Sequence, residues 1–278
     1  MASFDFDQAE GLRRMLAGPK PRLVTFLSAT AGDEKGAMLV NLGASLVQAG
    51  NDVLIVDACQ RERGVARALE MERHVSLLQV ARQECALNQV VQHAPQGFQV
   101  ATLVRDGVAP QAGSDEARRL AKAFDVLVKG QGGIVIVDGE LGRDGSFAVP
   151  MLAESEIVVQ VSTGATSITN AYTLIKRLAQ EFGRRPFGIL VTGASEAEAE
   201  IVYDNMSQAA SRYLAVTLTS MGSVPADEYL HRAARLGRSV VDAFPLAGAS
   251  VAFRQLAGRF ALPAMAGVKR HAGSRISP

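Results

Sequence analysis

The sequence predicts an α/β fold, a three-layer sandwich in which helices cover both faces of a mostly parallel sheet. Short apolar runs that suit strands alternate along the chain with longer segments of helical periodicity. Several of these runs are apolar throughout, which is typical of strands buried on both faces. Strands that alternate with helices are joined by right-handed crossovers, so their neighbours in the sheet are parallel.

The strands are expected where apolar and β-branched residues cluster and then meet a polar residue. These runs are residues 23–27, 53–56, 134–137, 157–161 and 187–191, and a further strand is expected to begin within residues 215–218.

The helices are expected where apolar residues recur every three or four positions. They are residues 37–48, 116–129, 167–182, 196–212, 227–235 and 250–260, the first of them closed by Gly50. The α/β domain is expected to span residues 22–262, between an N-terminal segment at 1–21 and a flexible tail at 263–278.

Composition excludes several classes of protein. A hydrophobic content of 48% excludes a wholly disordered chain, and a net charge of +1 does not favour nucleic-acid binding. No apolar run approaches the roughly 20 residues of a membrane span. The first residues lack the basic start and apolar core of a secretory signal, and two cysteines are too few for a disulfide framework. A cytoplasmic, reduced protein is the simplest expectation.

The loop between the first expected strand and helix has the position of a phosphate-binding loop but few of its residues. Residues 29–36 read A-T-A-G-D-E-K-G where the motif is G-x-x-x-x-G-K-[ST]. Gly32 and Lys35 are the candidate phosphate contacts. A carboxylate such as Glu34 about 4 Å from a phosphate charge costs roughly 4 kcal/mol at an effective dielectric constant of 20. The alternative is an ordinary strand-to-helix turn.

Two aspartates follow buried strands, where ligands of open parallel sheets bind. Asp57 ends the second run and Asp138 ends the next one. In a nucleotide-binding protein such aspartates hold Mg²⁺ or its water ligands. The alternative is that each carboxylate caps the turn or helix that follows it.

Several segments resemble the MinD/ParA group of deviant P-loop ATPases and, within it, the FlhG (FleN) family of flagellar number regulators. The most discriminating is D-Q-A-E-G-L-R at residues 7–13, followed by T-G-A-T-S-I-T-N-A-Y-T-L-I-K at 163–176. Residues 198–203 and V-P-A-D at 224–227 also fit, the latter like the segment near the nucleotide base. The resemblance implies ATP and Mg²⁺ as cofactors, held by Gly32, Lys35, Asp57 and Asp138.

The chain departs from the family at several functional positions. Thr30 stands where the family has a lysine that reaches the partner's ATP across a dimer, and Gly36 lacks the hydroxyl that binds Mg²⁺. Cys59 replaces the proposed hydrolytic aspartate, and Thr192-Gly193 replaces the asparagine that contacts adenine. We therefore expect weak nucleotide binding and little or no hydrolysis, with no residue assigned a catalytic role.

The N-terminal segment has two interpretations. Its apolar residues recur at helical spacing, so it is either an amphipathic helix folded onto its own domain or, as the resemblance implies, a peptide that docks on an FlhF-type GTPase and stimulates it. The candidate docking residues are Asp7, Gln8, Ala9, Leu12 and Arg13. The resemblance further implies flagellar switch or regulatory proteins as partners, which recruit the protein to the cell pole.

Two other functions remain open at this point. One is an active MinD-like ATPase switch that dimerises on ATP. The other is a ParA-like cargo positioner associated with DNA, against which the near-neutral charge argues. Residues 266–278 contain two glycines and a terminal proline, so no MinD-like membrane anchor is expected there.

Overall fold

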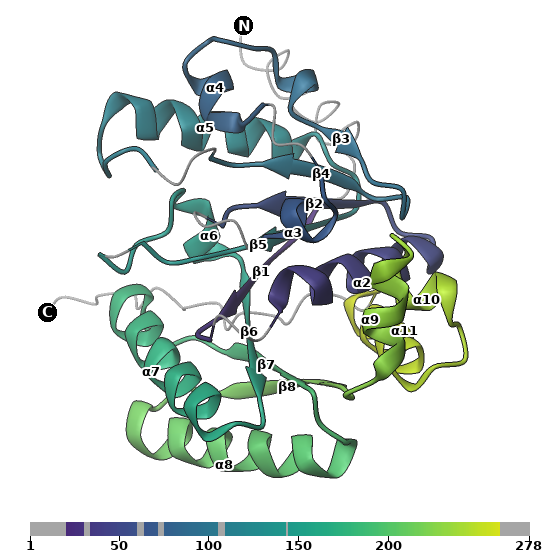
Figure 1. Cartoon of the computed structure of the whole chain (residues 1–278). Helices are drawn as coiled ribbons and strands as arrows, with labels where there is room; N and C mark the ends of the chain where they lie inside the picture. The colour runs from purple at the N-terminus through teal and green to yellow at the C-terminus, as the bar shows by residue number, and fades with distance from the viewer. Residues whose placement is uncertain are drawn as a thin grey trace, which may run out of the picture.

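A computed structural model describes residues 21–30, 34–59, 64–71, 75–104, 109–142 and 144–261. In this part of the chain eight strands form one sheet, in the order β3-β4-β2-β5-β1-β6-β7-β8 (Figure 1). The strands are β1 (Arg22–Ser28), β2 (Val53–Asp57), β3 (Gln92–His93), β4 (Gln99–Thr102), β5 (Ile134–Asp138), β6 (Glu156–Ser162), β7 (Phe187–Thr192) and β8 (Leu218–Val224). All neighbours are parallel except β3 and β4.

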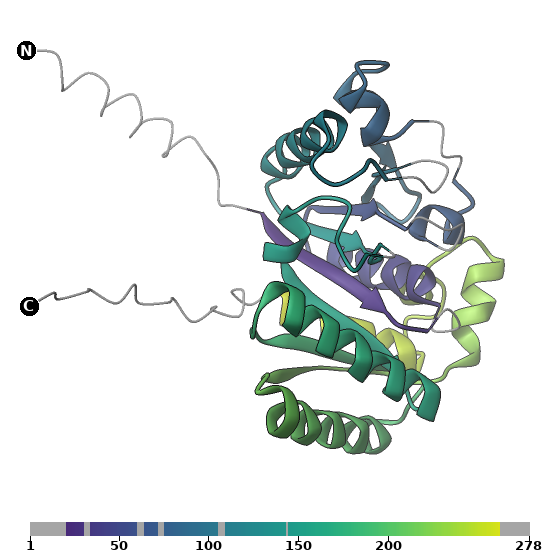
Figure 2. The same cartoon turned by 90° about the vertical axis from the view of Figure 1, so that its left-hand side faces the viewer.

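Helices cover both faces of the sheet, which confirms the predicted three-layer fold. One face carries α2 (Lys35–Gln48), α3 (Val65–Ala68), α9 (Glu228–Arg235), α10 (Val240–Ala243) and α11 (Gly248–Ala261). The other carries α4 (Leu77–Ala81), α5 (Asp115–Lys129), α6 (Met151–Glu154), α7 (Ala165–Phe182) and α8 (Glu196–Leu214), with the short 3-10 turn η2 (Leu87–Gln89) nearby. Figures 1 and 2 show the two helical layers on either side of the sheet.

The core is built from strands that are apolar on both sides. β2 and β5 are buried along their whole length, as their sequences V-L-I-V-D and I-V-I-V-D predict. Each face of the sheet has its own apolar cluster. None of the helices in the described part of the chain has the length and apolar character needed to cross a bilayer.

Local hydrogen bonds explain where the longer helices begin. The Ser114 hydroxyl accepts a hydrogen bond from the Ala117 amide ahead of α5, and Ser195 forms a capping box with Glu198 at the start of α8. Asp227 caps α9 through the Tyr229 amide. These side chains satisfy backbone N–H groups that have no partner within the first turn of a helix.

The structure corrects some of the expected boundaries. Residues 215–217 do not begin a strand: Ala215 has a left-handed conformation after α8, and β8 starts only at Leu218. β3 and β4 were not anticipated, because two and four residues are too short to show a clear alternation. Helix α2 begins at Lys35, two residues earlier than expected, which brings the lysine into its first turn. The proposed segments 1–21 and 263–278 lie almost entirely outside the described residues and stay expectations.

The side chain of Arg22, at the start of β1, forms hydrogen bonds with β6 and with α11. Its guanidinium donates two parallel hydrogen bonds of 2.8 Å to the Glu156 carboxylate and one of 2.6 Å to the carbonyl oxygen of Phe260. The same group lies 5.0 Å from the centre of the Phe260 ring. Only 12% of the Arg22 side chain and 15% of the Glu156 side chain are exposed, so this ion pair is shielded from water.

We expect Arg22→Ala to destabilise the protein by about 3 kcal/mol, because it leaves the Glu156 carboxylate nearly buried without its partner. The matched control is Arg118→Ala, whose ion pair with Asp115 is exposed and contributes less than about 1 kcal/mol. Urea unfolding of the three proteins measures the difference. Equal losses for the two variants would contradict the role assigned to Arg22.

Candidate functional site

The two aspartates expected at strand ends lie side by side. β2 and β5 are neighbours, and their register pairs Asp57 with Asp138, both fully buried. Asp57 accepts hydrogen bonds from the amides of Cys59 (3.1 Å) and Ala66 (3.0 Å), and Asp138 accepts one from the Val65 amide (2.9 Å). Both carboxylates therefore hold the backbone that leads into α3, in the manner of the capping alternative.

Lys35 reaches from the first turn of α2 into the same place. Its Nζ lies 2.5 Å from Asp138 Oδ1 and donates hydrogen bonds to the carbonyl oxygens of Gly139 (2.5 Å) and Phe26 (3.3 Å). Burial would lower the pKa of Lys35, but Asp138, Cys59 and Asp57 together raise that pKa above its ordinary value. The group is therefore a charged ammonium ion held among oxygen atoms from β1 and β5.

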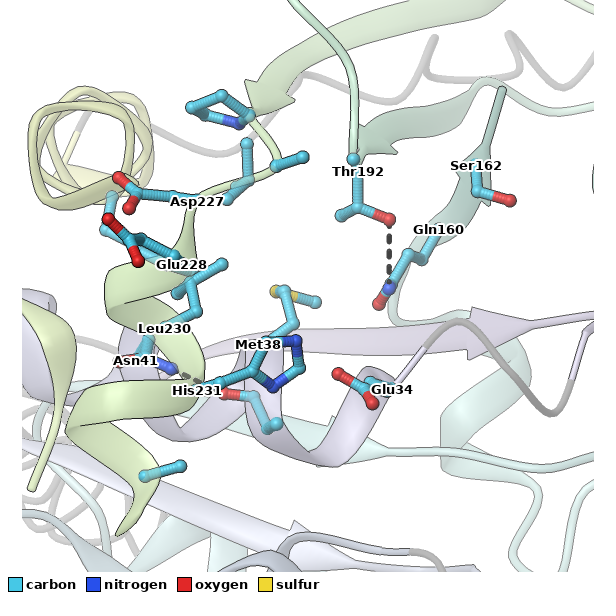
Figure 3. Close-up of a pocket in the computed structure, with 17 residues that line it drawn as sticks. Glu34, Met38, Asn41, Gln160, Ser162, Thr192, Asp227, Glu228, Leu230 and His231 are labelled. Carbon is cyan, nitrogen blue, oxygen red and sulfur yellow. Dashed lines mark hydrogen bonds between the residues drawn. The ribbon is translucent and has the colours of Figure 1, made fainter. Parts of the chain in front are cut away.

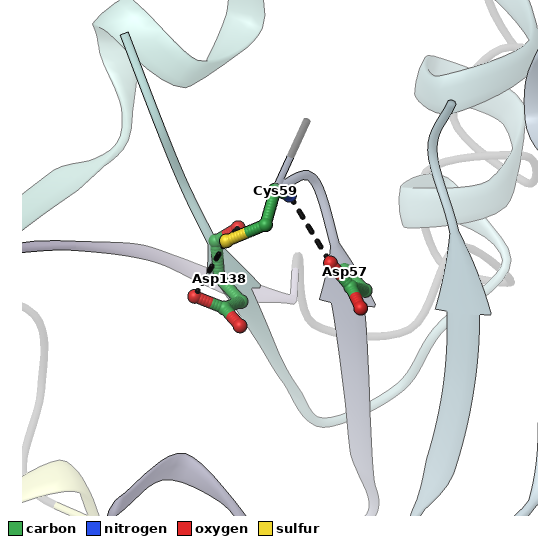
Figure 4. Close-up of side chains that lie close together, drawn as sticks. All are labelled: Asp57, Cys59 and Asp138. Carbon is green, nitrogen blue, oxygen red and sulfur yellow. Dashed lines mark hydrogen bonds between the residues drawn. The ribbon is translucent and has the colours of Figure 1, made fainter. Parts of the chain in front are cut away.

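Cys59 completes this buried cluster. Its thiol lies 3.4 Å from Asp138 Oδ1 (Figure 4). The same thiol lies 3.8 Å from Lys35 Nζ. Burial raises the pKa of the Cys59 thiol far above its ordinary value, and the Lys35 ammonium only partly offsets that effect. Ligand atoms of Asp57, Cys59 and Asp138 lie within 4.8 Å of one another, the one such group in the described part of the chain. A metal ion here would compete with the Lys35 ammonium and would have to deprotonate the thiol.

The loop before α2 presents a carboxylate at the helix N-terminus. Glu34 has a left-handed backbone (φ 48°, ψ 40°), a conformation that favours glycine, and its side chain makes no capping hydrogen bond. Thr30, at the position of the dimer-bridging lysine, donates its amide to Ser28 Oγ at 3.2 Å. Gly32 lies outside the described residues.

A cavity of about 570 Å³ opens beside Glu34, at the carboxyl ends of β6, β7 and β8 (Figure 3). The Gln160 amide, 3.3 Å from Thr192 Oγ1, lies on one side of it, and the turn from β8 into α9 lies on the other. The lining residues come from α2, the ends of three strands, α9 and α11: Glu34, Ala37, Met38, Asn41, Gln160, Ser162, Thr192, Gly193, Val224, Pro225, Ala226, Asp227, Glu228, Leu230, His231, Ala234 and Phe253. Its volume suits a small organic ligand.

The charged groups around this cavity are mainly acidic. Among the described residues that line it there is no lysine or arginine, whereas Glu34, Asp227 and Glu228 are present. The Asp227 carboxylate holds the starts of α9 and α11, because it accepts hydrogen bonds from the amides of Tyr229 and Ala249. A ligand bearing several negative charges would therefore meet the carboxylates of Glu34 and Glu228.

The structure thus brings together three of the four candidate cofactor residues, Lys35, Asp57 and Asp138. The candidate docking residues at positions 7–13 lie outside the described residues. Cys59, noted from sequence at the position of the family's hydrolytic aspartate, lies in the same cluster, although it was not among the candidate cofactor residues. The signal for this place is its position two residues after Asp57, on the turn that follows a buried strand.

We expect the two cysteines to differ in reactivity, because Cys59 is buried with a strongly raised pKa whereas Cys85 is partly accessible. Titration of the native protein with a chromogenic disulfide at pH 8 should modify Cys85 alone, and both thiols should react in denaturant. The Cys85→Ser variant is the control and should show no reactive thiol until it unfolds. Rapid reaction of that variant in its native state would show that the cluster is open to solvent.

Comparison with known proteins supports both the fold and the resemblance. No family model matches the chain. It is 28% identical to the antiactivator FleN of Pseudomonas aeruginosa over 245 residues, which are 85% of each protein. Among solved structures it superposes on MinD from Aquifex aeolicus in the MinC:MinD complex with a TM-score of 0.66 at 17% identity, covering 88% of this chain and 99% of that one.

MinD from Pyrococcus horikoshii, solved with Mg-ADP, superposes with a TM-score of 0.64 at 15% identity and covers 86% of this chain and 95% of that one. The identity to these structures is low, so they bear on the fold, whereas the similarity to FleN extends along most of both sequences. The chain is thus similar to the antiactivator FleN along most of its length and has the fold of MinD.

Proposed function

We propose that this chain is a FleN/FlhG-like regulator of flagellar number and placement that acts through protein contacts and hydrolyses little or no ATP. The similarity to the antiactivator FleN over 85% of both chains supports this proposal, as does the D-Q-A-E-G-L-R segment at residues 7–13. The partners are regulatory proteins, an FlhF-like GTPase among them. The occurrence of MinD in a complex with MinC supports the use of this fold for partner binding.

The observation that carries the proposal is the position of the Lys35 ammonium. A P-loop lysine serves by offering its charge to the phosphates of a nucleotide. Here Lys35 Nζ lies 2.5 Å from Asp138 Oδ1 and also donates to two carbonyl oxygens. Its charge is therefore already compensated inside the protein.

The other residues of the site do not fit a magnesium-bound nucleoside triphosphate either. Asp57 and Asp138, the candidate Mg²⁺ ligands, accept hydrogen bonds from backbone amides. The Glu34 carboxylate stands at the N-terminus of α2, where the helix dipole would otherwise favour a phosphate. Cys59 offers a thiol in place of the hydrolytic carboxylate.

A second candidate is an ATPase switch that dimerises on ATP. The observation in its favour is the cavity of about 570 Å³ lined by V-P-A-D at residues 224–227, the segment that resembles the family's base-binding turn. The two candidates differ in one measurable property, the affinity for Mg-ATP.

We expect isothermal titration of the full chain to give a Kd for Mg-ATP weaker than about 100 μM. The double variant Glu34→Gly with Gly36→Thr should bind at least tenfold more tightly, because it removes a carboxylate from the loop and restores a hydroxyl for Mg²⁺. Glu200→Gln, on the exposed face of α8 and away from the cavity, is the matched control for a change of charge outside the site. Micromolar affinity of the unmodified chain would favour the ATPase switch instead.

We expect the N-terminal segment to stimulate GTP turnover by an FlhF-like partner. Gln8→Ala should reduce the stimulation, since its amide is the polar group best able to orient water or phosphate, and Leu12→Ala should weaken binding through loss of an apolar anchor. Gln208→Ala on the exposed face of α8 is the control.

The measurements are GTP turnover with the full chain, with a chain lacking residues 1–20 and with the isolated peptide. A deletion that stimulates as well as the full chain would refute docking. A deletion that unfolds the protein would support the alternative in which the segment packs on its own domain.

A further inference from the structure

The backbone that enters α3 rests on the two buried carboxylates at the ends of β2 and β5. The Val65 amide donates to Asp138 and the Ala66 amide donates to Asp57. Gly64 lies so close to the Asp57 carboxylate that any side chain there would collide with it. The position of residues 64–66 therefore depends on the position and charge of these carboxylates.

Two neighbouring carboxylates without solvent need a compensating positive charge. Asp57 and Asp138 are each 0% exposed and are paired in strand register, so their negative charges repel each other through an interior of low dielectric constant. Lys35 forms an ion pair with the Asp138 carboxylate of this pair. Removal of the Lys35 charge would leave the buried Asp138 carboxylate without that ion pair, which is strongly destabilising.

The surroundings of the Lys35 ammonium resemble those of a bound cation. Oxygen atoms from three positions converge on Nζ, namely the carboxylate of Asp138 and the carbonyl groups of Gly139 and Phe26. They belong to the ends of β5 and β1, while Lys35 itself belongs to α2. One ammonium therefore connects two strands and a helix at the carboxyl end of the sheet.

We propose that Lys35 acts as a built-in cation that holds residues 64–71 against the ends of β2 and β5 in the absence of metal and nucleotide. This surface therefore has one conformation, which Mg-ATP does not alter, and a partner protein that binds there meets the same surface at every nucleotide concentration. The inference deepens the proposed function by removing nucleotide control from the same site. The experiments below measure amide exchange and stability. This inference can therefore fail while FleN-like regulation holds, and FleN-like regulation can fail while this inference holds.

The first experiment is amide hydrogen exchange of the full chain, read on peptides that contain Val65 and Ala66. In the unmodified protein these amides should exchange slowly, and at the same rate with and without 5 mM Mg-ATP. Lys35→Met should accelerate their exchange at least tenfold, whereas Lys129→Met, which removes an exposed lysine paired with Asp125, should leave it unchanged. A change of more than twofold on addition of Mg-ATP to the unmodified protein would overturn the proposal, as would normal protection in Lys35→Met.

The second experiment separates lost charge compensation from general damage. Lys35→Met combined with Asp138→Asn removes both charges of the pair, so the double variant should melt at a higher temperature than Lys35→Met alone. This comparison still decides the matter if the single variant fails to fold. A double variant no more stable than the single variant would overturn the proposal.

The third experiment uses Mn²⁺ as the probe. Lys35→Ala vacates the space among the oxygen atoms, so 5 mM Mn²⁺ should raise its melting temperature by several degrees and leave that of the unmodified protein unchanged. Equal stabilisation of both proteins, or none of the variant, would show that the ammonium does not occupy a cation position.

Discussion

The carboxyl end of the sheet depends on one ion pair, that of Lys35 with Asp138. The central strands β1, β5 and β2 all end at this point, and the first turn of α2 and the entry to α3 contact them there. Hydrophobic packing can place these strands, but it cannot place two carboxylates in the interior, because each buried charge costs several kcal/mol unless it is compensated. The ammonium of Lys35 makes that arrangement compatible with a folded protein.

This arrangement gives two neighbouring parts of the site different characters. Around Lys35 the protein's own charges compensate one another, whereas the cavity of about 570 Å³ beside Glu34 is lined by apolar, amide and acidic groups. The first part is therefore closed by contacts within the protein, and the second keeps space for a ligand.

The fold could be predicted from the sequence because its signals are local. Runs such as V-L-I-V-D and I-V-I-V-D admit few interpretations, and the helix caps at Ser114 and Ser195 are visible in sequence. The strand β4 could not be predicted, because four residues carry too little pattern and its pairing with β2 is a tertiary effect. The start of β8 could be placed only within residues 215–218, because alanine seldom adopts the left-handed conformation of Ala215 and the sequence gives no signal of that turn.

The candidate site was predictable as a set of positions but not as a set of contacts. The spacing of Lys35, Asp57 and Asp138 relative to their strands indicated that they meet, since parallel strands share one edge. Whether the lysine faces a ligand or a carboxylate depends on side-chain geometry that no spacing encodes. The contacts of Cys59 with Asp138 and Lys35 could not be predicted for the same reason.

The hydrogen bond from Arg22 to Phe260 brings the first and last described residues close together. Because Arg22 binds the Phe260 carbonyl, the described chain begins and ends at neighbouring points on the amino side of the sheet (Figure 2). The cavity and the Lys35 cluster lie at the carboxyl side, one strand length away, or roughly 20 Å for the seven residues of β1. The first described residues and the Lys35 cluster therefore lie at opposite edges of one sheet, so contact at one of these edges leaves the other edge uncovered.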